Sequence, residues 1–433
     1  MNSLYRPWTC KLLIFPGLGV LMGCNQPGPE FQKAAADLPK IKSEIQAAGI
    51  SLDLKDLQPK IRPEEDAYPL LESALKAETA FRKADNQFKI PHKLDDKEWL
   101  KIPEKELPAL VPYLDQVIRA TQRPKVDFRW DWATKNPAEI LFPELFQLKL
   151  ISRWLGLRAV LLAKSGKTAE ALVQLRAAFA ISDYVQQTPL AIHYLVGIAV
   201  EKITGSAALH AASWAGSDRQ FNDRIIILLQ ERATLPNPNA SIFKSEIAFA
   251  STTFRDPKNL FDTEDFLSEP TQPDWAKDPI MVDAYHGRIL KGFFEAIKIM
   301  ESGKSNLQIL AELEKETERQ SDPRDPVNAI RDELALDYGG MWASWMSRQT
   351  LHVLRSASIE LSAMWAKTGK APRDTTALGN RYVDPYSGQP IRFVKKGKLF
   401  VYSVGENQKD DGGAGKGGLD DMDILVPILN PNP

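Results

Sequence analysis

The sequence predicts a mainly α-helical protein, an antiparallel bundle of helical hairpins with a small β-hairpin module at its C-terminal end. Apolar residues recur at helical spacing over most of the chain up to Thr368, which is the pattern of helices that bury one face. The turns between the central helical segments are short, and short loops between long helices make neighbours antiparallel. At about Lys370 the helical period stops, and Pro, Gly, Asp and Tyr become more frequent.

Composition indicates a folded chain, long enough at 433 residues for two or three domains of roughly 150 residues each. Apolar residues make up 43% and charged residues 26%, close to the average of soluble globular proteins, which excludes a disordered or fibrous chain. The 55 Lys and Arg residues almost balance the 56 Asp and Glu residues, so no nucleic-acid partner is expected. Two cysteines cannot build a disulfide scaffold.

The first 24 residues have the organisation of a bacterial export signal. Two basic residues are followed by an apolar run, Leu12–Met22, which is far shorter than the roughly 20 residues that span a bilayer. The run ends in Leu21-Met22-Gly23-Cys24. This ending resembles the lipobox of bacterial lipoproteins, in which a Leu stands three residues before the Cys and a small residue stands directly before it.

The resemblance implies that residues 1–23 are removed and that Cys24 becomes an acylated N-terminus carrying chains such as palmitate. The protein would then be anchored in a bacterial membrane and face the periplasm or the exterior. Residues 25–29 form a short polar tether. Because Cys10 leaves with the signal, a reactive-cysteine enzyme is excluded on this interpretation. The alternatives are an ordinary signal peptide and an N-terminal anchor helix.

Helical segments are predicted from apolar stripes, from prolines in first turns and from capping residues. The clearest signal is three consecutive helices over 143–214, in which Leu172, Leu175 and Phe179 face inward. Residues 234–280 are expected to cross the surface, with a helix as an alternative over Ile242–Ala250. The predicted helices are Phe31–Ala48, Glu64–Phe81, Leu107–Ala120, Pro143–Lys164, Thr168–Gln187, Pro189–Ser213, Arg219–Ala233, 280–301, 305–319 and Val327–Thr368, the last with a kink at Gly339-Gly340.

One turn of this bundle resembles a known repeat. Leu161–Leu172 places Gly166 between two helices and Glu170-Ala171-Leu172 at the start of the second, which is similar to the inter-helix turn of a tetratricopeptide repeat. The pattern occurs once, whereas a solenoid needs about three copies at a fixed period. A generic helical hairpin is therefore favoured.

The C-terminal segment is expected to form strands. Ile391–Val394 and Leu399–Val404 are rich in β-branched and aromatic residues and flank a short Lys-rich turn, which predicts a β-hairpin. Ile424–Val426 would add a third strand. The resulting organisation is a signal peptide over 1–23, a tether with a short helix over 24–58, a helical domain over 59–369 and a β-module over 370–433.

Three motifs of the C-terminal segment, Asp384–Phe393, Phe400–Asn407 and Asp420–Ile424, follow one another in a characteristic order. The order resembles the C-terminal half of the major pseudopilin of type II secretion, with its Asp-Pro-aromatic loop, its strand ending in Tyr-Ser-Leu-Gly, its Gly-rich loop and its Asp-x-Asp-Ile end. The match covers less than a fifth of the chain. The pilin-type N-terminal helix and its processing motif are absent from the sequence, so the resemblance implies the β-module and not polymerisation into a pilus.

In that family a Ca²⁺ ion ties the β-module together. The resemblance implies that the backbone carbonyl of Val404 and the side chains of Asn407, Asp421 and Asp423 are ligands, although Asn407 stands where the family usually has Asp. The chemistry agrees, because Ca²⁺ takes several hard oxygen ligands in flexible loops and residues 410–418 are rich in Gly. The alternative is a solvated acidic loop that binds no ion.

Few other residues indicate chemistry. Trp130 and Trp132 lie in an aromatic cluster that is suited to stacking on a sugar or a peptide, and the alternative is that they wedge a loop onto the bundle. Glu64, Glu65 and Asp66 are explained as acids at the start of a helix, where the helix dipole favours them. The five histidines are scattered, and no pair has the spacing of a helical metal site.

These observations favour a non-catalytic, lipid-anchored protein of the cell envelope that acts as a structural or protein-interaction module. Its expected partners are the membrane, through the lipid anchor, and an envelope protein. An enzyme is not favoured, because no motif specifies a reaction. The alternative is an envelope ligand-binding protein or a hydrolase that uses the region of Trp130 and Trp132.

Overall fold

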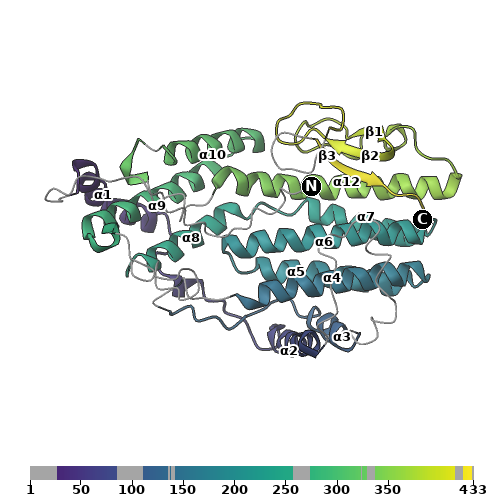
Figure 1. The fold of residues 1–433 in the computed structure, drawn as a ribbon, viewed down its shortest axis with the longest axis horizontal. Coiled ribbons are helices and arrows are strands. Elements are labelled where there is room, and N and C mark those ends of the chain that lie inside the picture. The colour runs from purple at the N-terminus through teal and green to yellow at the C-terminus, as the bar shows by residue number, and fades with distance from the viewer. Residues whose placement is uncertain are drawn as a thin grey trace.

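The structure, a computed structural model, has the predicted fold class: a bundle of helices with a small antiparallel sheet near the C-terminal end (Figure 1). The lipobox with Cys24, and Asp421 of the predicted calcium site, lie outside the described residues. The structure describes residues 27–84, 111–134, 137, 142–256, 274–322, 324–328, 337–414 and 423–431.

The helices follow the predicted order along the chain, with most ends within a few residues of the expected positions. Residues 242–250, for which a helix was the alternative, lie inside a longer helix, α8. The bounds are α1 Pro29–Ala47, α2 Tyr68–Ala84, α3 Val111–Ala120, α4 Pro143–Lys164, α5 Thr168–Gln186, α6 Ala191–Ala215, α7 Arg219–Ala233, α8 Asn239–Thr253, α9 Pro279–Met300, α10 Asn306–Gln320 and α12 Tyr338–Thr368.

The three central helices α4, α5 and α6 pack on one another, as predicted, and lie side by side in Figure 1. Short loops at 165–167 and 187–190 connect them, so consecutive helices run in opposite directions. Leu172, Leu175 and Phe179 are buried on α5. Burial of these side chains is the main force that holds the three helices together.

Helix α12 is the longest helix described and runs along the bundle as a central support (Figure 1). Its first half places Trp342 and Trp345 in an apolar core with residues of α9 and α10. Its second half places Leu354 and Leu361 in the core formed with α4, α5 and α6. One helix therefore joins both cores, and it also contacts β2 and β3.

The sheet has the strand order β1–β2–β3, with β1 Arg392–Lys396, β2 Lys398–Ser403 and β3 Ile424–Ile428. Both pairs are antiparallel, which confirms the predicted hairpin and third strand. Gly397 forms the tight turn between β1 and β2 with a φ of +70°, a conformation that glycine adopts without steric cost. Ser358 of α12 donates a hydrogen bond of 2.7 Å to the carbonyl of Pro427, which ties β3 to the bundle.

Three predicted details are wrong. The last helix, expected over Val327–Thr368, begins at Tyr338 after the N-cap Asp337, and Val327 lies in the 3₁₀ turn Pro326–Asn328. The helix expected from Glu64 begins at Tyr68, because Asp66 is buried, caps the amide of Tyr68 and forms an ion pair with Arg129. No kink forms at Gly339-Gly340: these residues are in the first turn of α12, where Asp337 accepts a hydrogen bond of 2.9 Å from the amide of Gly340.

Helix α1 packs across α9 at Gly287, where a Cβ atom would lie 3.5 Å from the carbonyl oxygen of Ala34. Figure 1 shows α1 and α9 toward one end of the long axis of the molecule, while the sheet and the C-terminal end of α12 lie toward the other. The two ends of the described chain are therefore well separated. Among the described residues, every helix is too short or too polar to cross a bilayer.

Candidate functional site

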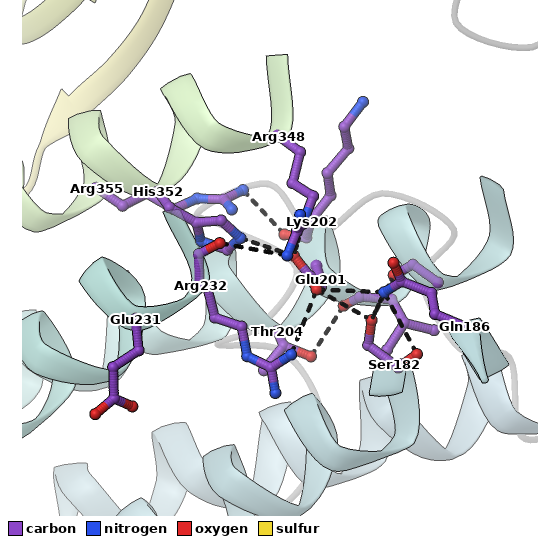
Figure 2. A network of polar contacts seen from close by, with 12 residues as sticks. Ser182, Gln186, Glu201, Lys202, Thr204, Glu231, Arg232, Arg348, His352 and Arg355 are labelled. Atoms are coloured by element: carbon purple, nitrogen blue, oxygen red, sulfur yellow. Dashed lines mark hydrogen bonds and ion pairs between the residues drawn. The ribbon is translucent and has the colours of Figure 1, made fainter. Parts of the chain in front are cut away.

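A buried carboxylate, Glu201 of α6, is the centre of a polar network inside the described part of the bundle. Its side chain is 1% exposed. Oε2 accepts hydrogen bonds from Nε of Arg348 at 2.5 Å and from Nε2 of His352 at 2.9 Å, both from α12. Oε1 lies 3.6 Å from Nη1 of Arg232 on α7. Figure 2 shows these groups directed at one another around Glu201.

Helix α5 completes the network. The hydroxyl of Ser182 donates to Oε1 of Glu201 at 3.3 Å and to the carbonyl of Gly197 at 3.0 Å. Arg232 also forms a bidentate pair with Asp183 of α5. The network therefore joins four helices, α5, α6, α7 and α12, through groups that are costly to bury unless they are paired.

The protonation states follow from this environment. Burial alone would raise the pKa of Glu201, but the hydrogen bonds from His352 and Arg348 and the charge of Arg348 hold that pKa well below its usual range. Burial lowers the pKa of His352 to about 4, despite the neighbouring carboxylate. A neutral His352 ring therefore donates its Nε2 proton to an ionised Glu201.

Arg355, one turn along α12 from His352, lies against α6. Its Nη2 donates to the carbonyl of Lys202 at 3.0 Å. A Cβ atom at Gly205 would lie 2.2 Å from Nη1 of Arg355, so the absence of a side chain there allows the guanidinium to approach the helix backbone. Burial lowers the pKa of Arg355 to about 10.

Sequence reasoning missed this network. One signal was present: Glu201 is an acid in a helix of high apolar content, and Arg348, His352 and Arg355 recur at helical spacing on α12. Such residues on inward faces indicate a buried polar cluster. The network brings them together, whereas none of the residues predicted from the motifs belongs to it.

Trp130 and Trp132 lie in an aromatic cluster against the start of α6. Trp130 stacks on Phe128 with ring centroids 4.9 Å apart and lies 4.6 Å from the ring of His193. Trp132 is buried next to Leu190. Burial lowers the pKa of His193 to about 3. The packing attaches the segment around Trp130 to the bundle, as in the wedge interpretation.

The same cluster contains buried polar atoms without a hydrogen-bond partner. They are Nε1 of Trp130, Nε1 of Trp132 and both ring nitrogens of His193. Buried polar atoms are usually paired, so a group of unpaired ones is a feature that a water or a small polar ligand would satisfy.

Three of the four predicted calcium ligands, Val404, Asn407 and Asp423, are among the described residues. Val404 is buried at the end of β2, and Asp423 directly precedes β3. Oδ2 of Asp423 accepts a hydrogen bond of 2.6 Å from the amide of Gly413, while its Oδ1 is buried without a partner. Asn407 donates to Asp411 at 3.1 Å, and the amide of Asp411 in turn bonds Asp423.

The electrostatics of this loop suit a cation. Burial raises the pKa of Asp423, and the charges of Asp410 and Asp411 raise it further. A bound cation would relieve both effects, and the unpartnered Oδ1 of Asp423 is a donor of the type that Ca²⁺ accepts. Among the described residues, no three or more His, Cys, Asp or Glu side chains are grouped as a metal site. Asp421 lies outside those residues.

Asp384, the first residue of the pseudopilin-like loop, organises the β-module. It is fully buried, and its Oδ1 accepts a hydrogen bond of 2.6 Å from the hydroxyl of Ser403. Its Oδ2 accepts hydrogen bonds from the amide of Val404 at 3.2 Å and from the hydroxyl of Ser387 at 2.9 Å. This carboxylate therefore fixes the end of β2 and Val404, which precede the turn that contains Asn407.

An open cleft of about 430 Å³ lies at the end of α1, and neither Trp130 nor Trp132 lines it. Its polar side chains already contact one another: Arg255 pairs with Asp53 at 3.2 Å, and Ser51 donates to Asp56 at 2.6 Å. The lining residues are Gln46, Gly49, Ile50, Ser51, Leu52, Asp53, Asp56 and Arg255.

Fold and site together define an α-helical bundle with a buried ion network and a C-terminal three-stranded sheet. No protein-family model matches the chain, and comparisons with curated proteins and with solved structures gave no significant match.

Proposed function

We propose that this chain is a lipid-anchored protein of the bacterial cell envelope that acts as a structural or protein-interaction module. The observation that carries the proposal is the lipobox Leu21-Met22-Gly23-Cys24, after which helix α1 begins only five residues later, at Pro29. Two or three acyl chains on Cys24 would give stable anchoring, whereas a single chain gives only marginal binding.

The ion network supports a scaffold role for the bundle. Glu201, Arg348 and Arg232 are satisfied by one another and by neighbouring helices (Figure 2). Such a network specifies one arrangement of the helices, because any other arrangement leaves a buried charge unpaired. A rigid bundle of this kind suits a protein that holds a surface at a defined place above the membrane.

Replacement of the lipidated residue tests the anchor. Cys24→Ala is expected to abolish incorporation of labelled palmitate and to release the protein from sedimented membranes. Cys10→Ala is the matched control, since Cys10 would leave with the signal and its loss should change neither readout. Full membrane retention of the Cys24→Ala protein, without palmitate, would contradict the proposal. Capture of the same envelope protein from solubilised membranes by wild-type chain and not by an unrelated lipoprotein would identify the partner.

We also propose a Ca²⁺ ion in the C-terminal loop, held by the carbonyl of Val404 and by Asn407, Asp421 and Asp423. The unpartnered Oδ1 of Asp423 and the nearby Asp410 and Asp411 support this assignment. When bound, the ion would supply a cross-link between the end of β2 and the start of β3. The role is structural, because small β-modules have too little core to be stable alone.

A second candidate function, binding of a small envelope ligand at the aromatic cluster, has one observation in its favour. The ring nitrogens of Trp130, Trp132 and His193 are buried without partners. A saccharide or a peptide that binds there should change tryptophan fluorescence, and Trp130→Ala should remove that change. Binding that persists in the Trp130→Ala protein would exclude the cluster as the site.

A further inference from the structure

The start of α1 lies close to the residue that carries the proposed lipid anchor. Only three peptide units separate Cys24 from Pro27, and such a chain reaches at most about 11 Å. Pro27 is itself held on α1, because its carbonyl accepts a hydrogen bond of 3.1 Å from Nε2 of Gln32. An acylated Cys24 would therefore bring the first turn of α1 to the membrane surface.

The surface beside this turn includes an aromatic and an aliphatic side chain. Phe31 of α1 packs edge-on against Tyr285 of α9 with centroids 5.8 Å apart, and Tyr285 packs in the same way on Trp275 at 5.1 Å. Trp275 is half-buried in the 3₁₀ turn Asp274–Lys277 that precedes α9, and Lys277 is exposed. Ile280, in the first turn of α9, is 37% exposed.

We propose that Trp275 and Ile280 form a face that docks on the phospholipid surface in which Cys24 is anchored, an inference that rests on the proposed function. Tryptophan is favoured at the boundary between acyl chains and water, and an exposed isoleucine gains by burial among acyl chains. We name this surface the anchor face.

The orientation of the whole molecule follows from this contact. The anchor face lies at the α1 and α9 end of the long axis, while the sheet β1–β3 and the end of α12 lie toward the other (Figure 1). Docking at the first end therefore points the β-module away from the bilayer, where a partner in the envelope can reach it.

Depth-dependent fluorescence quenching tests the orientation. On the lipobox interpretation the mature chain has no thiol besides Cys24, so a single introduced cysteine is labelled specifically. The acylated full-length protein carries Lys277→Cys, between the two residues of the anchor face, or Lys367→Cys at the far end of α12, both at exposed positions. It is reconstituted in phosphatidylglycerol and phosphatidylcholine vesicles that contain brominated phospholipid.

The label at 277 is expected to be quenched several-fold more strongly than the label at 367. Ile280→Asp should reduce quenching at 277 without releasing the protein, since the acyl chains still hold it. Val383→Asp, at a position 45% exposed in the C-terminal segment, is the matched control and should leave quenching unchanged. Equal quenching at both labels, or no effect of Ile280→Asp, in protein whose acylation is verified by mass spectrometry would overturn the anchor face. A protein that carries no acyl chain would instead defeat the proposed function.

Discussion

Glu201→Gln offers a quantitative test of the buried network. The substitution preserves the shape of the side chain and removes its charge, so the guanidinium of Arg348 loses its ionic partner while remaining buried. Glu201 accepts two close hydrogen bonds, at 2.5 Å from Arg348 and at 2.9 Å from His352. Hydrogen bonds to charged groups contribute about 1.5–3 kcal/mol each, which sums to about 3–6 kcal/mol.

The expected loss of stability is therefore about 3–5 kcal/mol, the usual range when one partner of a buried ion pair is removed. This is a large part of the roughly 5–15 kcal/mol that stabilises a typical domain. Equilibrium unfolding in urea, followed by circular dichroism, measures the change. Glu231→Gln is the matched control, because Glu231 lies on α7 beside Arg232 but is exposed, and it should cost less than about 0.5 kcal/mol. A loss below about 1 kcal/mol for Glu201→Gln, as for an exposed ion pair, would refute the reasoning.

Three further outcomes are expected. Phe179→Ala should cost about 3–5 kcal/mol in urea titration, because its ring is fully buried, and a loss near zero would contradict the packing of α5. Burial lowers the pKa of His193 and His286 to about 3 and that of His352 to about 4, below an ordinary value of 6.5. The folded state therefore favours the neutral rings. The contribution of each histidine to the free energy of unfolding is complete above about pH 6.5 and decreases as the pH falls toward 4. At about pH 5 the loss is about 2 kcal/mol per histidine. A flat unfolding midpoint between pH 7 and pH 5 would contradict this sign. Ca²⁺ at ten times a dissociation constant of about 10⁻³ M should stabilise the chain by about 1.4 kcal/mol, and Asp423→Asn should remove the effect. If Ca²⁺ and chelator change the unfolding free energy of the wild-type and Asp423→Asn proteins equally, the calcium site in the loop is contradicted.

Local patterns were sufficient to predict most helices and all three described strands. Phe179 and Leu175 repeat with the period of a helix that buries one face, and Lys395–Lys398 separates two runs of strand-forming residues. Each of these signals lies within a single helix or hairpin, so it can be recognised without knowing which other segments pack against it.

Contacts between distant segments were beyond sequence reasoning. Glu201 and Arg348 are separated by 147 positions, and no local pattern pairs them. Asp66 was assigned to a helix start because acids are favoured there, yet its carboxylate pairs with Arg129, 63 positions away. The acidic loop is visible in the sequence, but the effect of the charges of Asp410 and Asp411 on Asp423 is not. The role of such a carboxylate depends on which distant residue it contacts in the folded chain, and its charge alone does not reveal that residue.

The mass and sequence of the N-terminal peptide of the mature protein, purified from membranes, test the lipid anchor most directly. The proposal predicts that the peptide begins at Cys24 and carries the mass of a diacylglyceryl group on sulfur and an acyl chain on the amino end. A peptide that begins at Met1, or one that begins at Cys24 or later with no lipid mass, would contradict it.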